Sequence, residues 1–346
     1  MTKKSREEII DSVLKFLDEK PLSIQQISEK VGSNWVTVNE ILEELKSNGK
    51  VKEVVATDKI KILKRTDYPV FYGVPIRKEL RDQTLFIASE ITKEWKKQNK
   101  GELPLNTTLQ KVAVEIIKNC NLDLPVLPLH YGLVTALAMK PEEQVNQTYD
   151  WKWMPEKSVI LKEIEKEVPK HKNRASEEED RQYAEYGLKL FQTRKEIVNL
   201  FKEGLEKIDI NELNKKILRM SFLLSTDNLE VYNLFDRFVS SSIIVFMSKE
   251  PKKNLSEIRE TFDTLWDLVT TEMFLKEGRK FIPPEDIQLF ELIRSFHLNS
   301  KISATEERLS NLESLSSSIN PDEMDIPMDE ESIEIRRIMA EGLGRE

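Results

Sequence analysis

The sequence predicts a mainly α-helical protein, in which an N-terminal unit of three helices and a β-hairpin precedes an all-α helical body and an acidic C-terminal tail. Three observations indicate this fold class. Glycine accounts for only 10 of the 346 residues, which argues against a turn-rich β protein. Apolar residues recur at spacings of three and four along most of the chain, as they do on amphipathic helices. The alternating runs typical of strands are short, at residues 51–55 and 60–63.

Composition and charge narrow the class of protein. Apolar residues make up 39% and charged residues 33% of the chain, enough for a core beneath a charged surface. The net charge of −8 means that any contact with nucleic acid is local. The single cysteine, Cys120, excludes an internal disulfide and a thiolate zinc cluster.

These features also indicate a location. The first residues form no apolar signal core, and the longest apolar run, Ile243–Met247, is far shorter than the ~18–20 residues of a membrane span. We therefore expect a cytoplasmic protein with no membrane partner.

Spacing and capping residues predict the three N-terminal helices. Residues 6–19 place their apolar side chains on one face. Ser23 is expected to cap a second helix, which ends at Gly32. Ser33 or Asn34 caps the third helix. The two alternating runs follow, and residues 57–59 join them as the turn of a hairpin.

A family resemblance rests on residues of the second helix, the third helix and the hairpin. The N-terminal sequence resembles winged helix-turn-helix transcription regulators in four segments: Leu22–Ser28, Val31–Val38, Leu42–Leu45 and Asn48–Val51. The start of the third helix, Asn34-Trp35-x-Thr37-Val38, is similar to that of many archaeal regulators of this superfamily. The resemblance covers about a fifth of the chain. It implies a regulator that binds double-stranded DNA, usually as a homodimer.

The residues that would contact DNA form two groups. Asparagine pairs with adenine in the major groove, and valine or threonine methyl groups contact the thymine methyl. Lysines on the hairpin would neutralise backbone phosphates. The predicted DNA-binding residues are Asn34, Val36, Thr37, Asn39, Lys46, Lys50, Lys52, Lys59, Lys61, Lys64 and Arg65.

An alternative hypothesis is a non-enzymatic adaptor or scaffold whose winged helix docks a protein partner. The third helix carries Glu40, Glu43 and Glu44, and residues 1–65 hold 13 basic and 11 acidic residues, a balance of only +2. The position of the hairpin discriminates between the hypotheses. If its cations share a face with Asn34 and Asn39, DNA binding is favoured; if the glutamates lie between them, protein docking is favoured.

The rest of the chain divides by composition. Residues 129–140 are expected to be helical, 177–207 to form one long helix, and 285–298 and 302–316 to form two helices. The expected segments are a winged helix-turn-helix at 1–66, a connector at 67–75, a small helical unit at 76–145, an irregular linker at 146–176, a helical bundle at 177–316 and an acidic, flexible tail at 317–346.

Two segments are candidates for contact with a partner. In the linker, Trp151 and Trp153 either fix the segment to the body or stack on unpaired bases or a peptide. Residues 322–346 contain nine acidic and three basic residues, a composition typical of disordered tails. Apolar residues within the tail, such as Ile338, are spaced for a short helix that forms on a protein partner.

The sequence contains no motif of a catalytic site. The patterns GxxxxGK[ST], GxGxxG and HExxH are absent. The three histidines, His130, His171 and His297, are far apart in sequence, and none has a neighbouring metal-ligand pair. We therefore expect no enzymatic activity, no cofactor and no metal.

Overall fold

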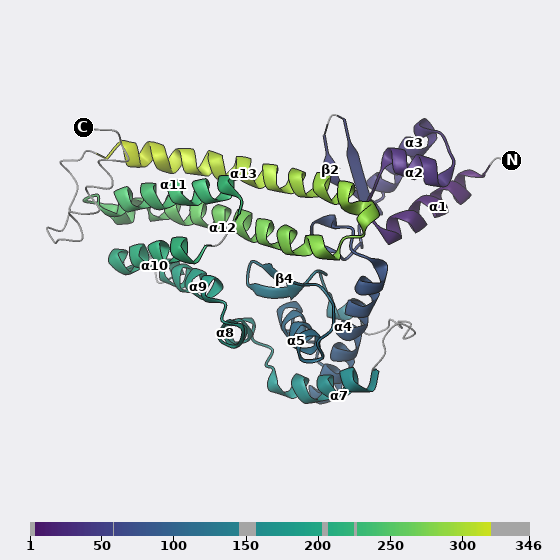
Figure 1. Ribbon diagram of the computed structural model, residues 1–346, viewed down its shortest axis with the longest axis horizontal. Coiled ribbons are helices and arrows are strands. Elements are labelled where there is room, and N and C mark those ends of the chain that lie inside the picture. Colours follow the sequence, from purple (N-terminus) through teal and green to yellow (C-terminus); the bar gives the residue numbers. More distant parts are fainter. Residues whose placement is uncertain (1–3, 58, 145–156, 203–206, 225–226, 320–346) are drawn as a thin grey trace. The chain divides into compact units, whose positions relative to one another are not determined.

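The computed structural model describes residues 4–57, 59–144, 157–202, 207–224 and 227–319, and the protein is mainly helical over these residues (Figure 1). Trp151, Trp153 and the acidic residues of the tail lie outside the described residues. The chain divides into two compact units, residues 1–188 with 270–300, and residues 189–269 with 301–346. None of the described helices combines the length and the apolar character that a membrane span requires.

The N-terminal module, residues 1–66, contains the three predicted helices and the predicted hairpin. Ser5 and Ser23 each form a capping box at the start of a helix, and Gly32, with φ of 68°, ends the second helix. A short strand that the sequence analysis did not predict, β1, completes an antiparallel sheet of order β1-β3-β2. The elements are α1 (Arg6–Glu19), β1 (Leu22–Ser23), α2 (Ile24–Val31), α3 (Trp35–Ser47), β2 (Val51–Ala56) and β3 (Lys61–Arg65).

The small sheet of the module is buried on both faces. Val51 and Leu63 pack on the core that the three helices share. The opposite face packs against α13 (Ile287–Ser317), through Leu289 and Ile293. A register shift between Glu53 and Val55 places the consecutive residues Val54 and Val55 in this second cluster. The hairpin is therefore held between the three helices of the module and α13, within the first unit.

The remainder of the first unit surrounds a second small sheet. The connector forms η1 (Phe71–Gly73), where Tyr72 adopts a φ of 56°. The other elements are α4 (Lys78–Gln98), α5 (Asn106–Asn119), β4 (Val126–Leu129), β5 (Gly132–Thr135), α6 (Pro141–Gln144), α7 (Lys157–Glu167), η2 (Val168–Lys170), α8 (Ala175–Tyr186), η4 (Arg279–Phe281) and η5 (Pro284–Asp286).

The predicted helix at 129–140 is wrong, because this segment supplies most of an antiparallel hairpin. Gly132 turns the chain with a φ of 104°, a value that favours glycine. The buried Lys111 stabilises the turn, since its Nζ donates to the carbonyl oxygens of Tyr131 (2.6 Å) and Leu133 (3.2 Å). It also donates to Oε1 of Gln182 (2.8 Å). A short apolar run is compatible with either a helix or a strand, and here these partners, distant in sequence, favour the strand.

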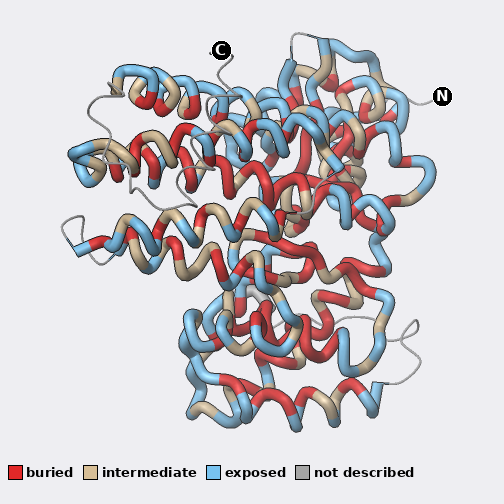
Figure 2. The backbone as a smooth tube through the Cα atoms, turned by 60° about the vertical axis from the view of Figure 1, so that its left-hand side comes forward, coloured by how far each residue is buried: buried red, intermediate tan, exposed pale blue. Residues whose placement is uncertain are grey.

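The second unit is a helical bundle. It comprises α9 (Lys189–Lys202), α10 (Ile210–Leu223), α11 (Leu229–Phe246) and η3 (Pro251–Asn254), with parts of α12 (Leu255–Gly278) and α13. Buried residues recur along the inner faces of its helices (Figure 2). Aromatic contacts build the core: the ring centroids of Phe238 and Phe262 are 6.0 Å apart, and those of Phe191 and Trp266 are 5.2 Å apart.

Two predicted helix boundaries are wrong. The single helix expected at 177–207 is interrupted at Gly187, whose φ of 63° ends α8 before α9 begins. The two helices expected at 285–298 and 302–316 are one continuous helix, α13. The residues between them, 299–301, include neither glycine nor proline, and Lys301 forms an ion pair with Asp267 of α12.

Candidate functional site

The first turns of α3 are the most exposed apolar part of the N-terminal module. Asn34 caps this helix, because its Oδ1 accepts a hydrogen bond from the backbone N–H of Thr37 at 2.8 Å. Trp35 and Val36 follow with exposed fractions of 53% and 60%. Thr37 and Asn39 are half-buried. A partner that approaches α3 therefore meets an indole, a branched aliphatic chain and an amide.

Two of the predicted phosphate-binding lysines are held by carboxylates. Nζ of Lys46 lies 2.8 Å from Oε1 of Glu53 and 4.0 Å from Oε2 of Glu43. Nζ of Lys61 lies 3.8 Å from Glu43 and 3.9 Å from Glu53. The hydrogen bond to Glu53 is the main cause that raises the pKa of Lys46 above its ordinary value. These four side chains, which we call the lysine–glutamate network, join α3, β2 and β3.

Lys64 and Arg65 belong to the junction with the connector. Lys64 is buried, and its Nζ donates to the carbonyl oxygen of Tyr68 at 3.3 Å. Burial, followed by repulsion from Lys52, lowers the pKa of Lys64 to about 8. Arg65 lies 2.8 Å from a carboxylate oxygen of Asp18 and 2.8 Å from one of Asp67.

The remaining predicted cations are exposed. Within the part of the chain that the structure describes, Lys50, Lys52 and Lys59 form no ion pair. The position of the hairpin therefore favours neither DNA binding nor protein docking alone. Lys59 and Lys61 line the same pocket as Asn39, whereas Glu43 lies between Lys46 and Lys61.

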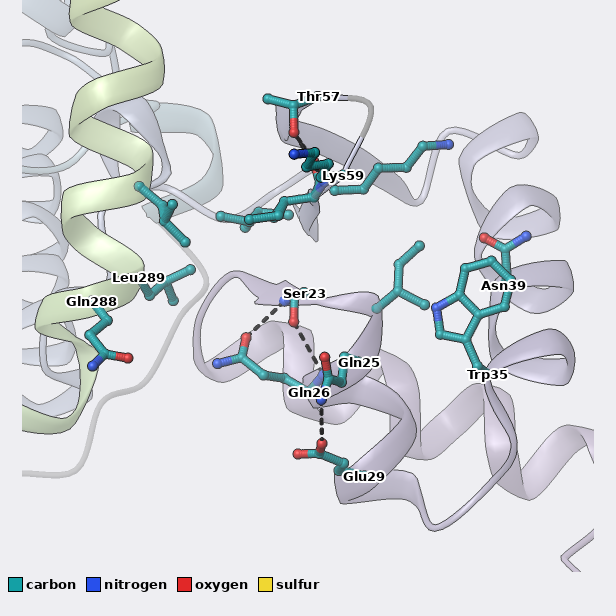
Figure 3. A pocket seen from close by; sticks show the side chains of 15 residues that line it. Ser23, Gln25, Gln26, Glu29, Trp35, Asn39, Thr57, Lys59, Gln288 and Leu289 are labelled. Atoms are coloured by element: carbon teal, nitrogen blue, oxygen red, sulfur yellow. Dashed lines mark hydrogen bonds between the residues drawn. The ribbon is translucent and has the colours of Figure 1, made fainter.

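That pocket has a volume of about 660 Å³ and lies between the module and the part of α13 that belongs to the first unit, residues 287–300 (Figure 3). In Figure 3, Trp35 and Asn39 lie on α3 on one side, and Gln288 and Leu289 lie on α13 on the other. The pocket is lined by Ser23, Ile24, Gln25, Gln26, Glu29, Trp35, Asn39, Thr57, Lys59, Ile60, Lys61, Ile62, Gln288, Leu289 and Leu292.

A buried charged cluster in the first unit was not predicted from the sequence. His171 has no exposed side-chain surface and lies between two carboxylates. Its Nε2 is 3.0 Å from Oε2 of Glu115 on α5, and its Nδ1 is 2.5 Å from Oε2 of Glu178 on α8. Arg181 donates to the same oxygen of Glu115 at 2.8 Å, and Lys170 donates to Glu167 at 2.5 Å. His171 lies in the segment 146–176 that was expected to be a linker, and its partner Glu115 is 56 residues away in the sequence.

Opposing effects set the protonation of this cluster. Burial by itself would lower the pKa of His171, but hydrogen bonds with Glu115 and Glu178 raise it above its ordinary value. Burial would raise the pKa of Glu178, while hydrogen bonds from His171 and the backbone N–H of Lys172 lower it. Both ring nitrogens face carboxylates, which only accept hydrogen bonds, so the imidazolium form is favoured.

Glu115, Glu167 and His171 place three potential metal-ligand atoms within 4.8 Å of one another. However, the hydrogen bonds of His171 use both of its ring nitrogens. The three carboxylates of the cluster are matched by His171, Lys170 and Arg181. The charges therefore balance without an ion, and the arrangement fits a structural network that ties α5 to η2 and α8.

Comparison with protein-family models, curated proteins and solved structures finds no match for this chain.

Proposed function

We propose that the N-terminal module is a winged helix-turn-helix that binds double-stranded DNA and that the protein is a non-enzymatic transcription regulator. The observation that carries this proposal is the arrangement of the module: three helices lead into a hairpin whose sheet has the order β1-β3-β2. This arrangement leaves the first turns of α3 exposed and brings Asn39 to the same pocket as the hairpin residues Lys59 and Lys61.

In this proposal, residues at the start of α3 contact the DNA bases. Val36 offers methyl groups to thymine, and the amide of Asn39 can pair with adenine. The oxygen of Asn34 is already committed to Thr37, which leaves its amide nitrogen for contact with DNA. Lys50, Lys52 and Lys59 contact phosphates, whereas Lys64 and Arg65 stabilise the junction with the connector.

The test is binding of the full chain to mixed-sequence duplex DNA, measured by fluorescence anisotropy across a salt series. Each lysine that contacts a phosphate contributes about 0.9 to the slope of log affinity against log salt. Replacing Lys50, Lys52 and Lys59 with serine should therefore weaken binding at low salt and flatten the slope by up to about 3.

A matched variant controls for total charge. Lys162, Lys202 and Lys215 are exposed residues outside the module, and their replacement with serine removes the same charge. This control should bind DNA with the affinity and the slope of the native protein. Absence of DNA binding by the native protein at the lowest salt, where electrostatic attraction is strongest, would exclude the regulator proposal.

Protein docking is the second candidate function, and the glutamates of α3 favour it. Glu40, Glu43 and Glu44 are exposed on this helix, and Glu43 contributes to the network that neutralises Lys46 and Lys61. Exposed aromatic residues beside polar side chains are typical of protein interfaces. If the native protein does not bind DNA, the Trp35→Ala variant is compared with the native protein, and protein docking predicts that the variant loses binding to a protein partner.

A further inference from the structure

The pocket beside α3 has an apolar wall and a polar rim. Trp35 from α3, Ile60 from the hairpin and Leu289 and Leu292 from α13 supply apolar surface. Trp35 and Leu292 retain exposed fractions of 53% and 43%, so both present apolar surface that the protein leaves uncovered. A volume of about 660 Å³ lies within the range of small-molecule sites, about 300–1,000 Å³.

The polar groups of the rim differ in how far they are already engaged. Gln26 is committed to the capping box with Ser23, Gln25 donates to Glu29, and Thr57 bonds within the hairpin turn. Among the described residues, the side chains of Asn39, Lys59 and Gln288 make no hydrogen bond or ion pair. These three groups come from three different elements and line the same space, with Asn39 on the α3 side and Gln288 on the α13 side (Figure 3).

Charge indicates which ligand this space suits. Lys59 carries an ammonium with no carboxylate partner among the described residues, while Lys61 is held by Glu43 and Glu53. Glu29, the acidic residue of the lining, accepts a hydrogen bond from Gln25 and keeps its negative charge, but Figure 3 shows it at the opposite edge from Lys59. A ligand with one negative charge would therefore pair with Lys59 and find a second polar contact in the amide of Asn39 or of Gln288. The indole of Trp35 and the leucines would contact a flat apolar body.

We propose that this pocket is a binding site for a small aromatic or heteroaromatic monoanion. The ligand would contact α3, the hairpin and α13 together. The site does not depend on the proposed DNA binding, because its walls and a lysine with no carboxylate partner among the described residues are features of the pocket itself. If the module does bind DNA, a ligand against Trp35 and Asn39 would lie beside the base-reading residues.

The test uses anilinonaphthalene sulfonate, an aromatic monoanion whose fluorescence rises in apolar sites, and its uncharged parent phenylnaphthylamine. The full-length native protein should bind the sulfonate saturably, at one site per chain. Lys59→Gln should weaken the sulfonate about tenfold, as expected for loss of a charge-assisted hydrogen bond, and leave the uncharged dye unchanged. Asn39→Asp, an isosteric change that adds negative charge, should do the same.

Two further variants locate the binding. Leu292→Asp, at an exposed position, should weaken both dyes. The control Phe222→Ser removes a side chain of the second unit that is 87% exposed and should leave both dyes unchanged. Thermal unfolding confirms that each variant is folded. The proposal is overturned if no saturable binding occurs, if Lys59→Gln affects both dyes equally, or if Phe222→Ser rather than Leu292→Asp removes binding.

Discussion

At the scale of single residues, the two carboxylates around His171 favour its cationic form inside the first unit. The two carboxylates on its ring nitrogens belong to α5 and α8, so the residue joins two helices that are distant in sequence. A buried charge is tolerated only when it is paired and hydrogen bonded, and the oxygens of Glu115 and Glu178 meet this need. Removal of the imidazolium would leave Glu115 with Arg181 and Glu178 with the backbone N–H of Lys172, and would take one positive charge from two buried carboxylates.

The replacement His171→Gln should therefore cost about 3 kcal/mol of the free energy of unfolding near pH 6. The pKa of His171 is raised on folding, so its contribution is fully present below its ordinary value of 6.5 and is lost as the pH rises through the raised value. The pKa of Glu178 is lowered, so its contribution is present above its ordinary value of 4.5 and is lost as the pH falls through the lowered value.

Urea denaturation of the native and His171→Gln proteins between pH 5 and pH 9 measures this effect. The difference in the free energy of unfolding should be largest near pH 5–6 and should shrink at alkaline pH. A difference that stays constant over the whole range would show that His171 contributes through packing and not through its charge.

Lys64 shows why the burial of single residues in the candidate site could not be predicted from the sequence. A hairpin with one solvated face alternates buried and exposed residues, and this pattern underlay the expectation of a basic, exposed hairpin. In β3, however, Ile62, Leu63 and Lys64 are all buried. Ile62 packs against α13, more than 220 residues further along the chain, and Lys64 contacts Tyr68 of the connector; local periodicity contains no sign of either covering layer.

At the scale of elements, helices with clear capping residues could be predicted from the sequence. Elements whose conformation depends on contacts with residues distant in sequence could not. Ser5, Ser23 and Asn34 cap the three N-terminal helices, and the predicted helices and hairpin are present. The hairpin of β4 and β5 was not found, because the bonds from Lys111 and Gln182 that hold it come from outside the segment. The continuity of α13 was also missed, since polar residues at 299–301 resemble a helix end.

The lysine–glutamate network should limit the DNA affinity of the module. Replacing both Glu43 and Glu53 with glutamine frees Lys46 and Lys61 for phosphates and removes two negative charges from the face beside α3. We expect tighter binding to duplex DNA at low salt and a slope of log affinity against log salt that is steeper by up to about 2. The measurement is the same anisotropy salt series.

The control is the pair Glu212→Gln and Glu230→Gln, which makes the same change of net charge at exposed positions of the second unit. Equal gains in the two double variants would indicate a general charge effect and not release of the two lysines. Unchanged binding in Glu43→Gln/Glu53→Gln, with DNA binding by the native protein intact, would show that Lys46 and Lys61 do not face the duplex.

At the scale of the whole molecule, the charges are unevenly distributed along the chain. Residues 1–65 carry a balance of +2, so the remaining residues carry −10. The acidic remainder opposes the approach of a duplex, and this opposition weakens as salt screens it. Of the seven predicted cations, only Lys50, Lys52 and Lys59 are exposed and free of ion pairs in the described parts of the chain.

Three phosphate contacts from one module give a weak interaction, so useful affinity requires two modules on one duplex. We therefore expect two chains in each complex with a DNA fragment that contains a single binding site. Mass photometry or sedimentation of the complex at moderate salt measures this stoichiometry, and a second measurement without DNA shows whether the dimer already exists. A stable complex with one chain per duplex would contradict the prediction, because the affinity would then require phosphate contacts beyond those three lysines.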